Sequence, residues 1–219
     1  MAKQTEKKEA FQFTLPKGRM INGSLFVKDK FDEKATPSYK IEVAFPKDKD
    51  FDAVIEKVLE FVDDTWPGLK DKDAELNIDG GNIISGILDG DRLAAKREKD
   101  GKNGDAYKGM YVIRASTLYN HEGRDGDGGV QVWDAAVKPI EPTDAGKVYN
   151  GCYVKVAVTL GHYEDDRSSN NGIKFYLGAV QKVDDGEKLV AQRDTSVLFK
   201  PVGRTEGAAE STTRSRRKG

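Results

Sequence analysis

Two segments toward the carboxyl end of the chain alternate apolar side chains with aromatic and cationic ones. From Cys152 to Leu160 every second residue is apolar, and Ile173, Phe175 and Leu177 repeat the pattern. Because successive side chains of a strand point to opposite faces, each segment is predicted to have one apolar face and one face of tyrosine and lysine. Aromatic rings stack on nucleobases and neighbouring cations neutralise phosphates, so such a face could bind a single nucleic-acid strand. The residues of suitable type and parity are Arg114, Tyr153, Lys155, Tyr163, Lys174 and Tyr176.

The same alternation is also typical of an ordinary half-exposed antiparallel sheet, in which tyrosine and lysine occupy solvated positions. Trp133 and Phe26 are candidates either for the rim of a binding face or for the core. The polar stretch from Glu164 to Gly172 is predicted to be the loop between the two strands. Parity alone leaves open which face is exposed.

A basic region from Gly90 to Lys108 is predicted to be a loop, because Gly, Asp and Asn interrupt it. One interpretation is an arm that follows a phosphate backbone. The other is a solvated loop, whose acidic residues dilute the positive charge. The basic residues of this predicted loop include Arg92, Lys96, Arg97, Lys102 and Lys108.

The overall composition argues against a uniformly basic nucleic-acid-binding protein. The 219 residues contain 36 Lys and Arg against 37 Asp and Glu, a formal net charge of -1, which still permits a local basic groove. The single cysteine, Cys152, excludes a disulfide within the chain and is predicted to be a buried apolar residue. The N-terminus lacks the apolar core of a secretory signal, and no stretch approaches the ~18 apolar residues of a membrane span. A reducing cytoplasm and no membrane partner are therefore expected.

No arrangement of residues typical of an enzyme is evident. The sequence has no GxxxxGK(S/T), GxSxG or HExxH motif, and His121 and His162 have no Cys or His at ligand spacing. The run that begins at Asp125 has part of a calcium-loop pattern but lacks its final glutamate. We therefore predict no catalytic residue, no metal site and no cofactor. A metal-dependent nuclease is an alternative hypothesis, built on the loop carboxylate pairs Asp89 with Asp91 and Asp165 with Asp166.

Strand-like alternation recurs along most of the chain, with one change to helical spacing. Phe51, Val54 and Val58 belong to an apolar series that predicts a helix over 50–64. Residues 1–10 are predicted to be a flexible arm, 11–202 one domain, and 203–219 a disordered tail with a basic end. The pattern predicts a mainly β fold, a small antiparallel barrel with the helix inserted after the third strand. The predicted strands are 11–16, 20–28, 39–45, 110–118, 130–135, 152–163 and 173–183, with short elements near 76–78, 83–88 and 189–198.

Three segments of the chain resemble the single-stranded DNA-binding proteins encoded by tailed bacteriophages. They are YKIEVAFPKDKDFDAVIEKVLEF (Tyr39–Phe61), GMYVIRAST (Gly109–Thr117) and the segment Tyr149–Val183. The resemblance implies an oligonucleotide/oligosaccharide-binding (OB) fold and non-specific binding of single-stranded DNA, without catalysis, in phage replication, recombination and repair. The DNA path that it implies uses Arg114, Tyr153, Lys155, Lys174 and Tyr176, together with Lys40.

The same resemblance implies the cytoplasm of an infected bacterium as the location. Phage or host replication and recombination proteins, and further copies of the chain, are the partners that it would add to single-stranded DNA. One departure concerns the tail: many such proteins end in an acidic segment that recruits partners, whereas this chain ends in Ser215-Arg-Arg-Lys-Gly219. The alternative function is a structural or assembly protein of a virion, with a β-barrel that makes protein contacts only.

Overall fold

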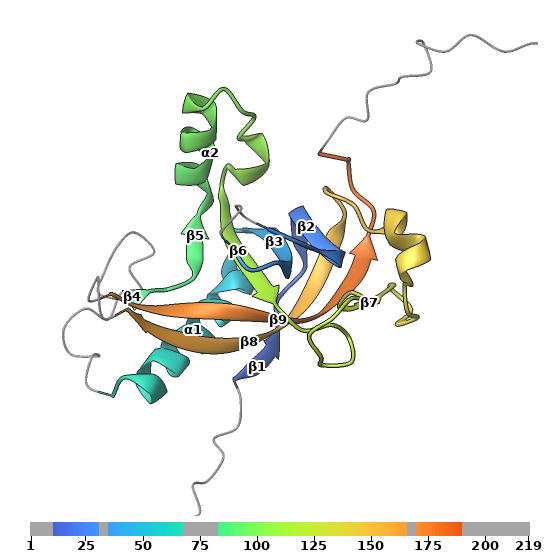
Figure 1. Cartoon of the computed structure of the whole chain (residues 1–219). Helices are drawn as coiled ribbons and strands as arrows, with labels where there is room; N and C mark the ends of the chain where they lie inside the picture. The colour runs from blue at the N-terminus through green and yellow to red at the C-terminus, as the bar shows by residue number, and fades with distance from the viewer. Residues whose placement is uncertain (1–10, 31–34, 68–82, 166–169, 190–219) are drawn as a thin grey trace, which may run out of the picture.

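The computed structural model of the chain describes residues 11–30, 35–67, 83–165 and 170–189 (Figure 1). The predicted arm, the predicted tail, and the elements expected near 76–78 and over 190–198 lie outside these residues. The elements in chain order are β1 (Gln12–Thr14), β2 (Gly18–Asp29), β3 (Ser38–Pro46), α1 (Lys49–Thr65), β4 (Ile83–Ile84), β5 (Ile87–Asp89), α2 (Gly90–Lys99), the 3-10 turn η2 (Asp105–Tyr107), β6 (Met110–Thr117), β7 (Gln131–Trp133), the 3-10 turn η3 (Pro142–Lys147), β8 (Tyr153–Asp165) and β9 (Asn170–Asp184).

The nine strands of the described residues belong to one sheet, in which the pairings of five strands form a ring. The order β2-β3-β6-β9-β8 returns to β2 because Gly18 pairs with Val154 and Arg19 with Tyr153. A ring with an odd number of strands cannot alternate direction throughout, and β6 and β9 are the neighbours that run parallel. The expected mainly β, OB-fold-like architecture is confirmed. The sheet is mixed rather than wholly antiparallel, since β4 and β7 also pair parallel with β9.

The apolar faces predicted from alternation point into the core. Val154, Val156, Val158 and Leu160 of β8 are buried, as are Cys152 just before this strand and the residues Ile173, Phe175 and Leu177 of β9. Helix α1 covers this core with one face, which consists of Phe51, Val54, Val58 and Phe61. Its start is capped by the Asp48 carboxylate, which accepts a hydrogen bond from the Asp50 N–H at 3.1 Å. Neither described α-helix is long and apolar enough to cross a membrane.

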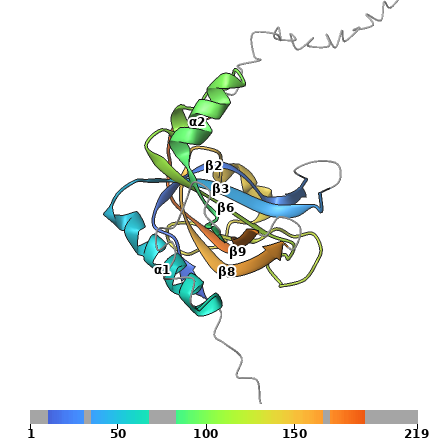
Figure 2. The same ribbon diagram turned by 90° about the vertical axis from the view of Figure 1, so that its left-hand side faces the viewer.

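The prediction of a loop over Gly90–Lys108 is wrong for most of that segment, which forms α2 and η2. The Asp89 side chain caps α2 by accepting from the Arg92 N–H at 3.0 Å, and residues 92–99 are mostly good helix formers. The helix packs through the buried Ala94 onto the outer surface of the sheet, where it contacts a second apolar cluster. That cluster consists of Ile21, Ala44, Ala94, Tyr107 and Val112. Figures 1 and 2 show α2 at the top of the molecule and α1 at its lower left, on another side of the sheet.

Three charged side chains connect α2 to the sheet. The Lys47 ammonium, just after β3, lies 2.7 Å from a carboxylate oxygen of Asp89 and 2.7 Å from one of Asp91. The second oxygen of Asp91 accepts a hydrogen bond from the Gly109 N–H at 2.8 Å, at the start of β6. The end of β3, the start of α2 and the start of β6 are thereby held together.

The loop predicted between the last two long strands is shorter than Glu164–Gly172. Strand β8 extends to Asp165 and β9 begins at Asn170, with Asp165 paired to Asn170. The polar residues at these positions continue a two-stranded ladder, because each strand satisfies the other's backbone groups whatever the side chains are.

The attachment of α2 is expected to weaken at acid pH. Hydrogen bonds from Lys47 and from the Gly109 N–H lower the pKa of Asp91. Burial opposes ionisation of Asp89, but hydrogen bonds from Lys47 and the Arg92 N–H lower its pKa overall. A carboxyl group with a lowered folded-state pKa stabilises the fold above its unfolded pKa of about 4, and this contribution is lost as the pH falls through the folded value.

Hydrogen-exchange protection in α2 should therefore fall more than protection in α1 between about pH 5 and pH 3. The variant Asp91→Asn should show a smaller difference between the two helices over the same range, because it lacks one of the titrating groups. An equal loss of protection in both helices of the unaltered protein would contradict this account.

Candidate nucleic-acid interface

Strands β3, β6 and β9 present one continuous outer face, on the side of the sheet away from the core. Lys40 of β3 is in register with Ser116 of β6, and Ser116 is in register with Tyr176 of β9. The residues beside them in each strand, Ile41, Ala115 and Phe175, are buried. The structure therefore brings together, on what we call the cationic face, the side chains of Lys40, Arg114, Ser116, Lys174 and Tyr176.

The cations of this face differ in their partners. Arg114 donates to the Glu42 carboxylate from Nη2 at 3.0 Å and from Nε at 3.3 Å, while more than half of its side chain stays exposed. Lys40 pairs with Asp29 at 2.6 Å. Lys174 has its ammonium 5.1 Å from the centre of the Tyr176 ring, and within the described residues it forms no ion pair. Among the described residues, Arg114 and Lys40 are thus paired with carboxylates, whereas Lys174 contacts an aromatic ring.

Two tyrosine rings lie flat across glycines of the adjoining strand. A Cβ atom on Gly161 would stand 2.3 Å from Cε2 of Tyr176, and one on Gly172 would stand 2.1 Å from Cζ of Tyr163. Both distances are far below van der Waals contact, so each ring requires a glycine beneath it. Tyr163 and Tyr176 are 41% and 44% exposed as whole residues, which leaves aromatic surface available for stacking.

Other predicted site residues lie away from the cationic face. Tyr176 pairs opposite Thr159 of β8, so Lys155 and Tyr153 are four and six residues along β8 from it, about 13 and 20 Å at the usual rise per residue. Tyr153 has the Lys17 ammonium 5.3 Å from its ring centre. Trp133 of β7 is partly buried and lines a separate small pocket together with Phe26. Tyr153 and Lys155 therefore lie further along β8 from the cationic face, and Trp133 lies in a different pocket.

The basic residues of the predicted loop are distributed over α2 and the turn after it. Arg92, Lys96 and Lys102 are exposed. Arg97 turns inward: its Nε donates to the Asn103 carbonyl at 2.8 Å, and its guanidinium lies 5.2 Å from the Tyr107 ring centre. Lys108 pairs at 2.9 Å with both Asp105 and Glu98, and these carboxylates raise its pKa.

A pocket of about 550 Å³ opens beside the cationic face. It includes Leu118 and Tyr119, which are 42% and 56% exposed. The sequence predicted Leu118 at the end of a strand and Tyr119 in a turn, with no functional role for either. An aromatic residue directly after a strand is weak evidence for a binding site in the sequence, because only the path of the following loop decides what its side chain faces. The described residues of its lining are Thr36, Ser38, Ser116, Thr117, Leu118, Tyr119, Lys174 and Tyr176.

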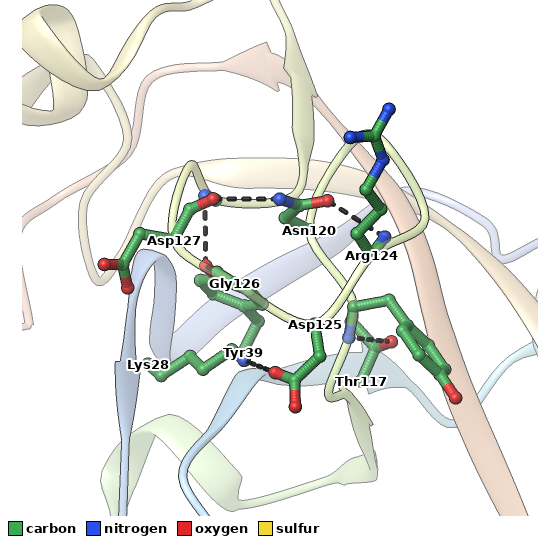
Figure 3. A network of polar contacts seen from close by, with 10 residues as sticks. Lys28, Tyr39, Thr117, Asn120, Arg124, Asp125, Gly126 and Asp127 are labelled. Carbon is green, nitrogen blue, oxygen red and sulfur yellow. Dashed lines mark hydrogen bonds and ion pairs between the residues drawn. The ribbon is translucent and has the colours of Figure 1, made fainter.

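The loop that carries Tyr119, residues 118–130 between β6 and β7, is held by a polar network (Figure 3). The Asn120 side chain accepts from the Glu122 and Arg124 N–H groups at 3.0 and 3.1 Å, and it donates to the Asp127 carbonyl at 2.9 Å. The buried Tyr39 hydroxyl donates to the Gly126 carbonyl at 2.8 Å and accepts from the Gly129 N–H at 3.2 Å. Lys28 adds an ion pair with Asp125.

Within the described residues, no group of three or more His, Cys, Asp or Glu side chains is placed to hold a metal ion. The described part of the site therefore consists of aromatic rings, hydroxyl groups and cations on a mixed sheet. Such an arrangement is suited to an extended anionic ligand with flat groups.

The fold and this face define an OB-fold-like protein with an aromatic and cationic outer surface. A family model described as the single-stranded DNA-binding protein of Enterobacter phage Enc34 matches residues 13–210, and the chain belongs to this family. The resemblance to phage single-stranded DNA-binding proteins expected from the sequence is thereby confirmed.

Solved structures of phage proteins share the fold. The single-stranded DNA-binding protein from bacteriophage Enc34 in complex with single-stranded DNA superposes with a TM-score of 0.59 at 19% identity, over 82% of this chain and 89% of that one. A C-terminal truncation of the Enc34 protein gives 0.58 at 19% identity, over 81% and 88%. Gp2.5, the single-stranded DNA-binding protein encoded by bacteriophage T7, gives 0.52 at 14% identity, over 88% and 97%. No curated protein sequence is significantly similar to the chain.

The loop network yields a stability prediction. Replacing Tyr39 by Phe keeps the buried ring but leaves the Gly129 N–H and the Gly126 carbonyl without their partner, which should lower the free energy of unfolding by about 1–3 kcal/mol. Urea denaturation measures this change. The control Tyr176→Phe removes a hydroxyl from a half-exposed ring and should change stability by less than about 0.5 kcal/mol. Equal effects of the two changes would contradict the assigned role of the Tyr39 hydroxyl.

The packing of the Tyr176 ring on Gly161 yields a prediction about side-chain position. Gly161→Ala should push the Tyr176 ring off the sheet, because the new methyl group would occupy the position of the ring edge. The ring-proton chemical shifts of Tyr176 should change clearly by NMR. Gly146→Ala is the control: a Cβ there meets no atom within 4 Å, and the Tyr176 signals should stay in place. Unchanged Tyr176 signals in Gly161→Ala would contradict the flat placement of the ring.

Proposed function

We propose that this protein binds single-stranded DNA without sequence specificity and coats exposed strands during replication of a phage genome. The observation that carries the proposal is the cationic face, where Lys174 and Arg114 flank the exposed ring of Tyr176 on the outer surface of an OB-fold-like sheet. The family to which the chain belongs, and the DNA complex of its Enc34 member, support the same function.

Each side chain of the face has a distinct proposed role. Tyr176 and Tyr163, which lie about four residues apart along the β8–β9 ladder, stack on bases, since stacking tolerates every base and therefore any sequence. Lys174 is held near the Tyr176 ring by a weak contact, so its flexible chain can move to a phosphate while the ring receives a base. Arg114 keeps one side on Glu42 and presents its exposed side to the backbone of the strand.

The remaining predicted residues extend this path. Lys40 exchanges the exposed Asp29 for a phosphate at little cost, because ion pairs at the surface are worth about 0–1 kcal/mol. Tyr153 and Lys155 continue the contact along β8 for a longer strand. Arg92, Lys96 and Lys102 of the α2 region attract the DNA backbone from one side of the path. Trp133 lines a different pocket, so any contact that it makes with DNA lies outside the cationic face.

The wider biological role follows from the same proposal. We infer that the protein acts without catalysis in the cytoplasm of an infected bacterium, and that its activity also serves recombination and repair. Replication and recombination proteins and further copies of the chain are the proposed partners. The basic tail differs from an acidic partner-binding tail, and its proposed role is a weak electrostatic attraction for DNA.

Binding of fluorescent oligo-dT, followed by anisotropy over a range of salt concentrations, tests the function. Affinity should fall as salt rises, with a log–log slope of about -0.7 for each phosphate contact on a single strand. Lys174→Ala should make the slope shallower by about 0.7. Tyr176→Ala should weaken binding by roughly tenfold at constant slope, because it removes stacking and not charge.

Lys57→Ala is the matched control for the lysine change, because Lys57 is half exposed on α1, pairs there with Glu60, and does not belong to the cationic face of β3, β6 and β9. It should alter neither the affinity nor the slope. No binding at low salt, or binding that does not depend on salt, would contradict the proposal. A labelled strand incubated with the protein and Mg²⁺ or Mn²⁺ should stay intact, and cleavage would point to the nuclease hypothesis instead.

A further inference from the structure

The pocket beside the cationic face has aromatic side chains from two separate parts of the chain. Tyr176 comes from β9, and Tyr119 comes from the β6–β7 loop. Both rings are about half exposed although they line one concave space, so neither is needed to fill the core. Exposed aromatic residues that converge on a pocket are typical of a ligand site rather than of ordinary surface.

The chemistry of the lining is that of a site for a nucleotide unit. The two rings and Leu118 supply apolar surface, and four hydroxyl groups supply donors and acceptors, from Thr36, Ser38, Ser116 and Thr117. Among the described residues of the lining, Lys174 is the charged one and none is a carboxylate. A nucleotide has a base with two flat faces and a polar edge, and a phosphate attached through the sugar. The tyrosine rings can stack on the faces of the base, and the hydroxyl groups can bond to its edge. Lys174 can pair with the phosphate.

The loop that holds Tyr119 is ordered before any ligand binds. The Tyr119 N–H donates to Thr117 Oγ1 at 3.2 Å, and Tyr119 pairs with Asp125 across the loop. The Asn120 side chain, next to it, makes three hydrogen bonds to backbone groups of the same loop. A ligand therefore does not need to order this segment, which reduces the entropic cost of binding.

We propose that Tyr119 and Tyr176 form a base clamp that takes one unstacked nucleobase of the bound strand, with Lys174 on the adjoining phosphate. This inference rests on the proposed function and adds a binding residue that lies outside the alternating strands. A base inside a duplex has both faces covered by its neighbours and cannot enter between two rings. The clamp therefore also provides a reason for the protein to prefer single strands over duplexes.

The test compares a thymine oligonucleotide with a strand of equal length whose nucleotides are abasic. Affinities are measured at one salt concentration for the unaltered protein, Tyr119→Ala and Tyr119→Phe. On the thymine strand, Tyr119→Ala should weaken binding about tenfold and Tyr119→Phe less than twofold, because the ring and not the hydroxyl makes the stack. On the abasic strand the three proteins should bind equally. The salt slope of Tyr119→Ala should equal that of the unaltered protein.

The outcomes separate the clamp from the function on which it rests. If the unaltered protein binds neither strand, the proposed function fails and the clamp fails with it. If it binds the thymine strand and Tyr119→Ala is silent, or if Tyr119→Ala loses the same factor on both strands, the clamp alone is overturned. Tyr119→Leu keeps an apolar side chain at this position but lacks the ring, so it should bind the thymine strand about tenfold more weakly than the unaltered protein does. Full affinity of that variant would show that apolar contact suffices, and would also overturn the clamp.

Discussion

The parallel pairing of β6 with β9 is the contact on which the cationic face depends. A ring of five strands must contain a parallel pair, and this one places Ser116 beside Tyr176. The cations of β3 and β6 thereby become neighbours of the tyrosine and lysine of β9.

The face also depends on what lies beneath and beside it. The aliphatic sides of β8 and β9 and the apolar face of α1 form one core, which keeps the outer side chains of those strands at the surface. Gly161 and Gly172 allow two tyrosine rings to lie flat on the ladder. Tyr39 joins both regions, because its ring is buried in the core while its hydroxyl holds the β6–β7 loop. A near-neutral chain can therefore present a local cationic surface.

Local patterns predicted much of the fold, and their failures have a common cause. The buried series from Cys152 to Leu160 and the apolar face of α1 were predictable, because each repeats several times along one element. Helix α2 was not, since its ten residues offer few apolar side chains. Its packing surface is supplied by Ile21, Ala44 and Val112, which are distant in sequence.

By itself, the sequence determined the two faces of each strand and the position of α1, because both depend on backbone periods that repeat every two or 3.6 residues. Only the tertiary structure decided which outward side chains meet. Arg114 and Lys40 join Tyr176, whereas Tyr153, of the same parity as Tyr163, lies at the far end of β8. Tyr119 enters the site through the path of a loop. Strand register and loop position depend on contacts between residues far apart in the chain, and no local period encodes them.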